Sequence, residues 1–207
     1  MSGTSLTAAS LALAEMDPVM EGLVAAYGPC RMRRPERADD RFQALANAIV
    51  YQQLAGNAAR AIWRRVRSLV AGPFTPEAVL ALSDEQLRGA GLSGSKVRSL
   101  RDLAEKVSTG QVRLARIGRL SDDAVEAELV QVRGIGPWTA HMFLMFTLRR
   151  LDVWPTGDYG VRAGFARAHG MDELPSPAEL QDLGERYRPY RSVAAWYCWR
   201  VLDTVTL

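Results

Sequence analysis

The sequence contains little cysteine, histidine or lysine. Its 207 residues include two cysteines, two histidines and two lysines. Cys30 and Cys198 are far apart and form no CxxC pair, so neither a disulfide framework nor a zinc or iron–sulfur site is indicated. His141 and His169 offer no ligand cluster. We therefore expect no required cofactor and no iron–sulfur cluster.

Long apolar runs are also missing. No stretch approaches the roughly 20 apolar residues that a membrane helix needs. The first eighteen residues hold a short Ala/Leu run, but no basic segment precedes it and Glu15 interrupts it, so they do not resemble a signal peptide. We expect a soluble, cytoplasmic protein without a membrane partner.

The charge of the chain is mildly basic and comes almost entirely from arginine. The net charge is +3, and 24 of the 26 basic residues are arginines, because Lys96 and Lys106 are the only lysines. Arginine suits bidentate contacts with phosphate. Genomic base composition produces the same bias, so composition alone leaves a polyanionic partner open.

Helical periodicity dominates the chain, and no segment shows sustained strand alternation, so the predicted fold class is all-α. One predicted helix carries a stripe of apolar residues at helical spacing, formed by Phe42, Leu45, Ala46 and Ile49, with Gln53 at its end. We expect Gly56 to end this helix and Asn57 to cap the next one. A helix is also expected to start at Pro18. The other expected helices fall within 41–56, 58–72, 75–83, 83–92, 93–110, 119–132, 137–148, 160–169, 176–186 and 189–205.

The segment "QVRGIGPWTAHMFLMFTL", residues 131–148, joins a tight turn to an almost unbroken apolar run. Pro137 suits the first position of a helix, and the apolar run predicts that this helix is central to the core. Glycines in the preceding turn let it close and leave backbone N–H groups beside the helix N-terminus, where they can bind a phosphate. A plain connection whose glycines serve only packing would give the same pattern.

Two motifs together resemble a known superfamily. "LVQVRGIGPWTA", followed by Asp158 in "WPTGDYGVR", is similar to the helix-hairpin-helix DNA glycosylases that carry a Gly/Pro-rich loop and an aspartate. The chain is most similar to their 3-methyladenine DNA glycosylase II branch. Further similarity lies in "AIVYQQLAGNAA", "LRGAGLSGSKVRSL" and "YRPYRSVAAWYCWRVL", so the resemblance covers about residues 42–202.

The resemblance implies a compact helical glycosylase fold over residues 1–207. Its expected subdomains are 40–150, which includes the hairpin 122–148, and 1–39 with 151–207, with an active-site cleft between them. It also implies a monomeric, monofunctional enzyme of base excision repair that binds damaged double-stranded DNA. Such an enzyme flips out an alkylated base of the 3-methyladenine or 7-methylguanine type and hydrolyses its N-glycosidic bond. Members that also cut the strand use a lysine where Trp138 stands here, so the expected product is an abasic site in an intact strand.

Asp158 is the residue that the resemblance makes catalytic. A carboxylate near the anomeric carbon can stabilise positive charge on the sugar and orient the attacking water. The alternative is an N-cap for the helix that begins near Tyr159, a common role for aspartate. One side chain can do both.

Aromatic residues are the candidates for the base pocket, because electron-rich rings attract a cationic alkylated purine. The family pattern points to Trp138, Trp199 and Tyr159, in that order. Met142 lies where a relative places a pocket aromatic. Aromatic residues of a helical domain usually belong to the core, as we expect for Trp196 and Tyr197. We also expect His141 to be a core histidine whose hydrogen bonds are satisfied.

The expected DNA contacts fall in two turns. Gln53 and Leu54 are both candidates for the wedge that fills the gap left by the flipped base. The expected hairpin contacts are Arg133, Gly134, Ile135, Gly136 and Thr139, with Arg133 standing where the family usually has proline. Backbone carbonyls of Val130, Val132 and Ile135 are candidates for holding a monovalent cation, as similar hairpins do.

A different class of function remains open from the sequence. The hairpin could belong to a non-catalytic module that binds DNA, loses affinity with salt and ignores lesions. Substitution of Asp158 would then leave every measured property unchanged.

Overall fold

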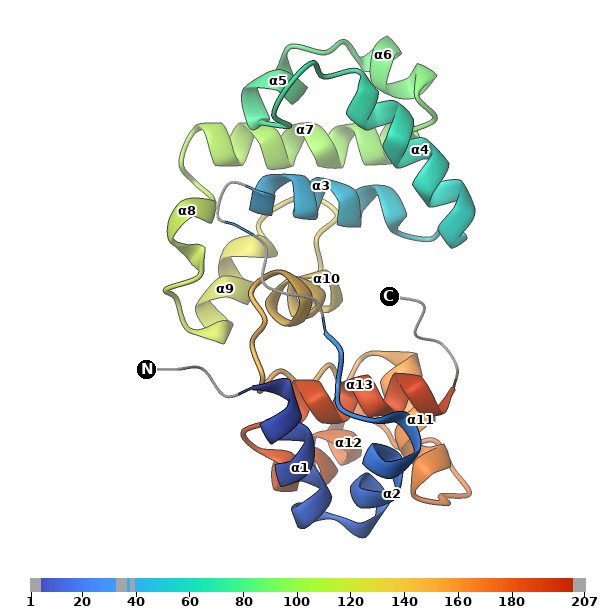
Figure 1. The fold of residues 1–207 in the computed structure, drawn as a ribbon. Coiled ribbons are helices and arrows are strands. Elements are labelled where there is room, and N and C mark those ends of the chain that lie inside the picture. The colour runs from blue at the N-terminus through green and yellow to red at the C-terminus, as the bar shows by residue number, and fades with distance from the viewer. Residues whose placement is uncertain (1–4, 33–36, 38–39, 203–207) are drawn as a thin grey trace. The chain divides into compact units, whose positions relative to one another are not determined.

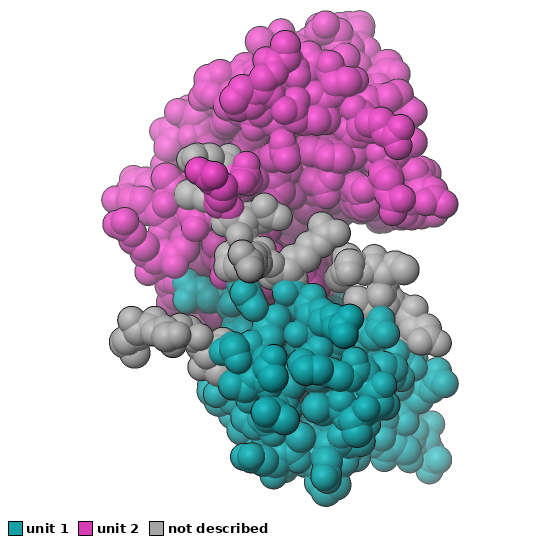
Figure 2. Space-filling model, in the orientation of Figure 1, with its two compact units in different colours: residues 1–34, 149–207 teal, residues 35–148 magenta. Residues whose placement is uncertain are grey.

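The structure is a computed structural model that describes residues 5–32, 37 and 40–202. Every regular element in these residues is a helix, which confirms the all-α prediction (Figure 1). The chain divides into two compact units, residues 35–148 (unit 2) and residues 1–34 with 149–207 (unit 1), shown in magenta and teal in Figure 2. The subdomains predicted from the sequence are 40–150 and 1–39 with 151–207.

Unit 2 is built around two long helices. α3 (Arg41–Tyr51) buries the expected stripe of Phe42, Leu45, Ala46 and Ile49, and it packs against α7 (Gly94–Ser108). The other α-helices of this unit are α4 (Gly56–Ser68), α5 (Pro76–Leu80), α6 (Asp84–Gly89), α8 (Leu114–Ile117), α9 (Asp122–Leu129) and α10 (Pro137–Met142).

Unit 1 is formed by the two segments that precede and follow unit 2 in the sequence. Its core helix is α13 (Arg191–Val201), which packs against α11 (Tyr159–Ala168), α2 (Pro18–Tyr27) and α1 (Leu6–Met16). α12 (Pro177–Gly184) and a 3₁₀ turn (Glu185–Tyr187) complete it. Nine consecutive residues of α13, from Arg191 to Trp199, are buried, so this helix is the centre of its unit.

Three details of the helix prediction are wrong. α3 ends at Tyr51, so Gln53 is not helical, and Gly56 begins α4 instead of ending α3. Asn57 caps nothing: the N-cap of α4 is Ala55, without a side-chain hydrogen bond. The cause is tertiary, because the Lys96 ammonium donates to the carbonyls of Val50 (2.6 Å) and Gln52 (2.8 Å) and so terminates α3 early.

The apolar segment after the hairpin is less regular than expected. α10 ends at Met142, and Phe143–Thr147 form a π-helix (η2). Phe143, Leu144 and Met145 are buried as predicted, whereas Trp138 at the start of α10 is 49% exposed. Helices α1 and α8 were not expected from the sequence.

Among the described residues, no helix is both long enough and apolar enough to cross a membrane.

Candidate functional site

Asp158 is the N-cap of α11, as one of the two interpretations of the sequence predicted. Its Oδ1 atom accepts a hydrogen bond from the Val161 amide (2.8 Å) and another from the indole Nε1 of Trp199 (2.9 Å). The residue is 9% exposed. Two N–H donors from different helices, α11 and α13, therefore hold the same carboxylate oxygen in place.

Small residues let α11 approach α13 closely enough for this contact. A Cβ atom at Gly160 would lie 2.8 Å from Trp199 Cδ1 and 3.1 Å from Asp158 Oδ1. A Cβ atom at Gly164 would lie 1.9 Å from the backbone oxygen of Cys198. The two glycines are thus required by packing, and the first of them directly protects the Asp158–Trp199 pair.

The irregular segment that carries Asp158 is itself anchored to unit 1. The hydroxyl of Ser192 donates to the Arg150 carbonyl (2.7 Å) and accepts from the Val153 amide (2.9 Å). Trp154 donates through Nε1 to the carbonyl of Leu180 (2.7 Å).

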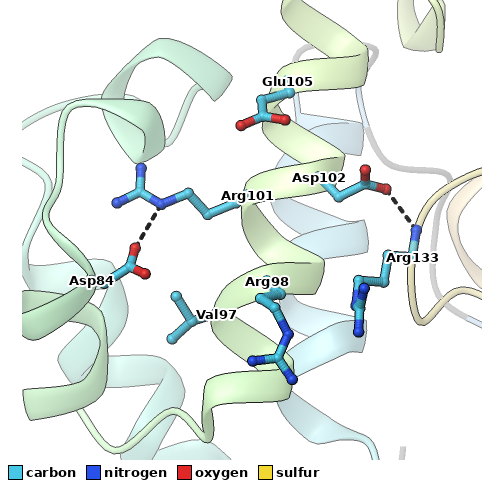
Figure 3. Close-up of a pocket in the computed structure, with 7 residues that line it drawn as sticks. All are labelled: Asp84, Val97, Arg98, Arg101, Asp102, Glu105 and Arg133. Atoms are coloured by element: carbon cyan, nitrogen blue, oxygen red, sulfur yellow. Dashed lines mark hydrogen bonds and ion pairs between the residues drawn. The ribbon is translucent and has the colours of Figure 1, made fainter.

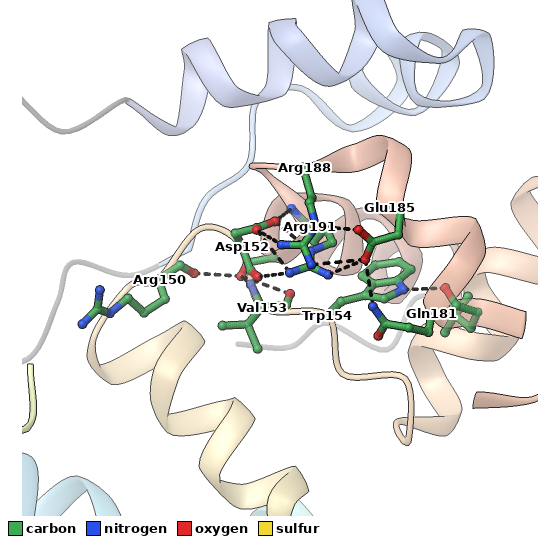
Figure 4. A network of polar contacts seen from close by, with 10 residues as sticks. Arg150, Asp152, Val153, Trp154, Gln181, Glu185, Arg188 and Arg191 are labelled. Carbon is green, nitrogen blue, oxygen red and sulfur yellow. Dashed lines mark hydrogen bonds and ion pairs between the residues drawn. The ribbon is translucent and has the colours of Figure 1, made fainter. Parts of the chain in front are cut away.

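Charged residues reinforce the same anchor (Figure 4). Arg191, which is buried, donates to Asp152 Oδ1 (2.8 Å) and to Glu185 Oε1 (3.0 Å). Arg188 donates to Asp152 Oδ2 (2.7 Å). The segment between unit 2 and α11 is therefore held at both its backbone and its side chains.

The aromatic candidates differ widely in exposure. Trp199 is 7% exposed and bonded to Asp158, whereas Tyr159 is 70% exposed. Trp138 and Met142 belong to unit 2, and Met142 is half-buried. Trp199 is thus better placed to orient the carboxylate than to offer its ring face.

Three residues were expected to belong to the core. Trp196 (6% exposed) and Tyr197 (0%) do, which confirms that prediction. His141 is satisfied but not in the core: it is half-buried and pairs with Glu126 of α9 at 2.9 Å. This pair joins the two helices of the hairpin.

The two glycines of the hairpin turn have different roles. Gly134 has φ +79°, and a Cβ atom there would lie 2.5 Å from the Ser99 hydroxyl, so only glycine fits. At Gly136 an added Cβ would meet nothing within 4 Å, so its glycine leaves open space in front of α10. The Ile135 amide donates to the Val132 carbonyl (3.0 Å) and is therefore used within the turn.

A glutamine that sequence reasoning missed connects the expected wedge turn to the hairpin. Gln52 Nε2 donates to the Gly134 carbonyl (2.9 Å) and to the Thr139 hydroxyl (3.2 Å). Its neighbour Gln53 is exposed with φ 55°, and Leu54 is 38% exposed. The adjacent glutamines of "YQQLAG" were the available signal, but the sequence could not tell which one turns inward.

Arg133 lies beside α7 in a depression of about 330 Å³ (Figure 3). Its amide donates to Asp102 Oδ2 (2.6 Å), and Lys106 donates to the same carboxylate at 2.7 and 2.6 Å. Burial raises the pKa of Asp102, but the hydrogen bonds from Lys106 and Arg133 outweigh it and hold the pKa below its usual value. Asp102 therefore fixes the backbone of the turn at Arg133.

That the backbone carbonyls of Val130, Val132 and Ile135 bind a monovalent cation stays a prediction. The Val132 oxygen accepts the Ile135 amide, which occupies one of its lone pairs and leaves the other available. Among the described residues, no cluster of histidine, cysteine or acidic side chains could hold a metal ion.

Comparison with known proteins gives consistent matches. Residues 46–189 match the model of the "HhH-GPD superfamily base excision DNA repair protein". The chain is 34% identical to DNA-3-methyladenine glycosylase 1 of Schizosaccharomyces pombe over 95% of this chain and 88% of that protein.

Two solved structures are similar over nearly the whole chain. One is the 3-methyladenine DNA glycosylase Mag1 of the same yeast in complex with abasic DNA, with a TM-score of 0.83 and 33% identity over 93% of this chain and 95% of that chain. The other is a DNA-3-methyladenine glycosidase from Bacillus halodurans, with a TM-score of 0.84 and 33% identity over 98% and 91%. Because the family model covers most of the chain and the yeast glycosylase is 34% identical over 95% of it, the chain belongs to the HhH-GPD superfamily of base excision DNA repair proteins.

Proposed function

We propose that the chain is a monofunctional DNA glycosylase that removes alkylated bases of the 3-methyladenine and 7-methylguanine type. The observation that carries the proposal is the Asp158 carboxylate, held by the Val161 amide and the Trp199 indole in a chain of this superfamily. The names of the relatives support the same reaction.

The reaction breaks the bond between C1′ of the sugar and the base nitrogen. The electron pair of that bond goes to the departing base, which an alkylated ring nitrogen has made cationic and which therefore leaves as a neutral molecule. Positive charge develops on the sugar, and Asp158 stabilises it electrostatically. A water oxygen then bonds to C1′ and loses a proton, which leaves an abasic sugar in the strand.

The pocket aromatics have separate roles in this proposal. The exposed rings of Trp138 and Tyr159 offer faces to a cationic purine, an attraction worth up to about 2 kcal/mol when desolvated. Trp199 acts as a positioning residue because its indole is committed to Asp158. Met142 adds a polarisable surface in place of a further aromatic.

Backbone and turn residues of unit 2 would hold the DNA. Gly136 leaves room for a phosphate to approach the start of α10, and Arg133 adds a cation nearby. The exposed Leu54 and Gln53 supply the wedge. A monovalent cation on the carbonyls of the 130–135 turn would add positive charge near the same phosphates.

Both lysines of the chain are bonded to other groups of the protein, which supports an intact product strand. Lys96 donates to two backbone carbonyls at the end of α3, and Lys106 pairs with Asp102 at 2.6 Å. Neither is presented as the nucleophile that strand cleavage requires.

The decisive experiment compares the wild-type chain with Asp158→Asn on a panel of single-lesion duplexes. Asparagine keeps an oxygen for the N-cap but loses the charge, so kcat should fall about 10²- to 10³-fold while affinity for DNA changes little. Asp172→Asn, an exposed aspartate of unit 1, is the control. Release of no methylated base by the wild type, or full activity of Asp158→Asn, would refute the proposal and favour a non-catalytic DNA-binding module.

Sedimentation of the complex tests the proposed monomer. Strand integrity of the product before treatment with alkali tests the absence of lyase activity.

A further inference from the structure

α4 carries an excess of positive charge that the fold does not neutralise. Its sequence, GNAARAIWRRVRS, contains four arginines and no acidic residue. The buried side of the helix is formed by Ala59 and Val66, and Trp63 packs edge-on against Phe74 with ring centroids 5.2 Å apart. These apolar contacts involve none of the four arginines.

The four arginines divide into two pairs. Arg65 donates to the Ala90 carbonyl (2.9 Å), and Arg67 donates to the carbonyls of Val70 (2.9 Å) and Gly72 (2.6 Å). Arg60 and Arg64 are exposed and make no hydrogen bond or ion pair with any residue that the structure describes. Since they are four residues apart, they lie on one face of the helix, which we call the α4 arginine face.

The position of this face suggests its partner. α4 begins at Gly56, two residues after the exposed Leu54, within one compact unit. At 1.5 Å per residue, Arg60 and Arg64 lie about 6 and 12 Å along the axis from the start of the helix. For a DNA strand that runs along α4, those distances correspond to about two and four nucleotide steps.

We propose that the α4 arginine face binds the sugar–phosphate backbone of duplex DNA about two to four nucleotides from the flipped base. The inference rests on the proposed function, which places the 53–54 turn in the DNA stack. Guanidinium groups match the geometry of phosphate oxygens, and phosphate contacts fix the register of a protein on DNA without reading its sequence. The contact would hold the duplex beside the wedge, on a surface separate from the hairpin.

The test measures affinity for duplex DNA against salt for the wild type, Arg60→Gln/Arg64→Gln and a control. The control is Arg116→Gln/Arg119→Gln, which removes the same two charges from exposed positions on or just after α8, on the other side of unit 2 (Figure 1). Loss of two phosphate contacts should reduce the slope of log K against log salt by about 1.8. Between 50 and 200 mM salt, the wild type should then lose about 12-fold more affinity than the α4 variant, and the control should follow the wild type.

A second arm locates the contact. Methylphosphonate groups, which remove the phosphate charge, are placed two to four nucleotides from an abasic-site analogue. They should weaken wild-type binding severalfold and leave the α4 variant unaffected. Equal salt slopes in all three proteins, or equal sensitivity to the neutral phosphates, would overturn the proposal.

The outcome is separable from that of the proposed function. Binding to the analogue needs no base excision, so different salt slopes with no release of methylated base would retain the arginine face and refute the glycosylase. Release of methylated base together with equal salt slopes would support the glycosylase and refute the arginine face. Thermal melting of each variant shows whether the exposed substitutions have changed the fold.

Discussion

The two regions that carry the candidate residues are built in opposite ways. At the junction of α11 and α13, the carboxylate and its indole partner are both buried, at 9% and 7% exposure. In the turns of unit 2, Leu54 and Trp138 are 38% and 49% exposed. In these turns, the side chains of Gln52, Lys96 and Asp102 form hydrogen bonds with backbone atoms and hold the backbone in place.

This difference fits the two tasks of the proposed enzyme. A group that stabilises developing charge gains most from a fixed geometry away from water. A surface that binds a nucleic acid needs its side chains free and its backbone rigid. Changes at the first region should therefore alter kcat, and changes at the second should alter stability or DNA affinity.

The largest effect expected in this comparison follows from Trp199→Phe. The change keeps the aromatic ring and removes the N–H donor to Asp158 Oδ1. A hydrogen bond to a charged group is worth about 1.5–3 kcal/mol, so kcat should fall about 10- to 100-fold with KM nearly unchanged, in single-turnover and steady-state assays of base release. Trp196→Phe, another buried tryptophan of α13, is the control and should keep kcat. A rise in KM alone would mean that the ring serves in the pocket and does not position the carboxylate.

The glycines of the hairpin turn provide the next test. Gly134→Ala places a methyl group 2.5 Å from the Ser99 hydroxyl at a positive φ, so we expect a loss of about 2 kcal/mol of unfolding free energy, measured by urea denaturation. Ser99→Ala in the same chain should restore part of it. Gly136→Ala meets no neighbour and should keep its stability but bind DNA more weakly. Equal stability of the two single variants would contradict the assignment.

The adjacent glutamines give a smaller, matched contrast. Gln52→Ala removes the bonds to Gly134 and Thr139 and should cost about 1 kcal/mol of stability. It should also weaken DNA binding about fivefold, because the wedge turn loses its anchor to the hairpin. Gln53→Ala changes an exposed side chain and should leave stability within about 0.5 kcal/mol. Fluorescence of 2-aminopurine beside the lesion reports base flipping in both, and identical behaviour of the two variants would argue against the anchor.

The smallest effect concerns pH. The folded state holds the pKa of Asp102 below its usual value. The carboxylate therefore stabilises the fold above about pH 4, and this contribution disappears as the pH falls through the lowered pKa. The Asp102–Lys106 pair is partly exposed to solvent, so the stability difference between wild type and Asp102→Asn should be less than about 1 kcal/mol. This difference should shrink in thermal melts below pH 4. A stability difference that grows in acid would contradict the sign.

The sequence could predict elements whose signals are local. Serine and aspartate caps, the Gly-Pro turn and the helical spacing identified most helices. An N-cap was one of the two roles considered for the aspartate of "TGDYG". Trp196 and Tyr197 were expected in the core because aromatic residues of helical domains usually are. These features depend on a few neighbouring residues, so one chain suffices to recognise them.

Features set by distant contacts were not predictable. α3 ends early because Lys96, 44 residues beyond Gln52, binds its last carbonyls. The bond between Trp199 and Asp158 spans 41 residues. No local pattern distinguishes Gln52 from Gln53, or α10 from the π-helix that follows it. The roles of the site residues remain predictions, since they need a substrate as well as a fold.

The placement of residues 35–148 between the two segments of unit 1 sets an order of events during synthesis. Unit 2 is translated without interruption and can fold as soon as it emerges. α1 and α2 must wait for α13, about 170 residues later, which at 5–20 residues per second is on the order of 10 s. Asp158 and Trp199 therefore meet last, so the nascent chain completes the unit proposed to hold DNA before the unit that carries the proposed catalytic carboxylate.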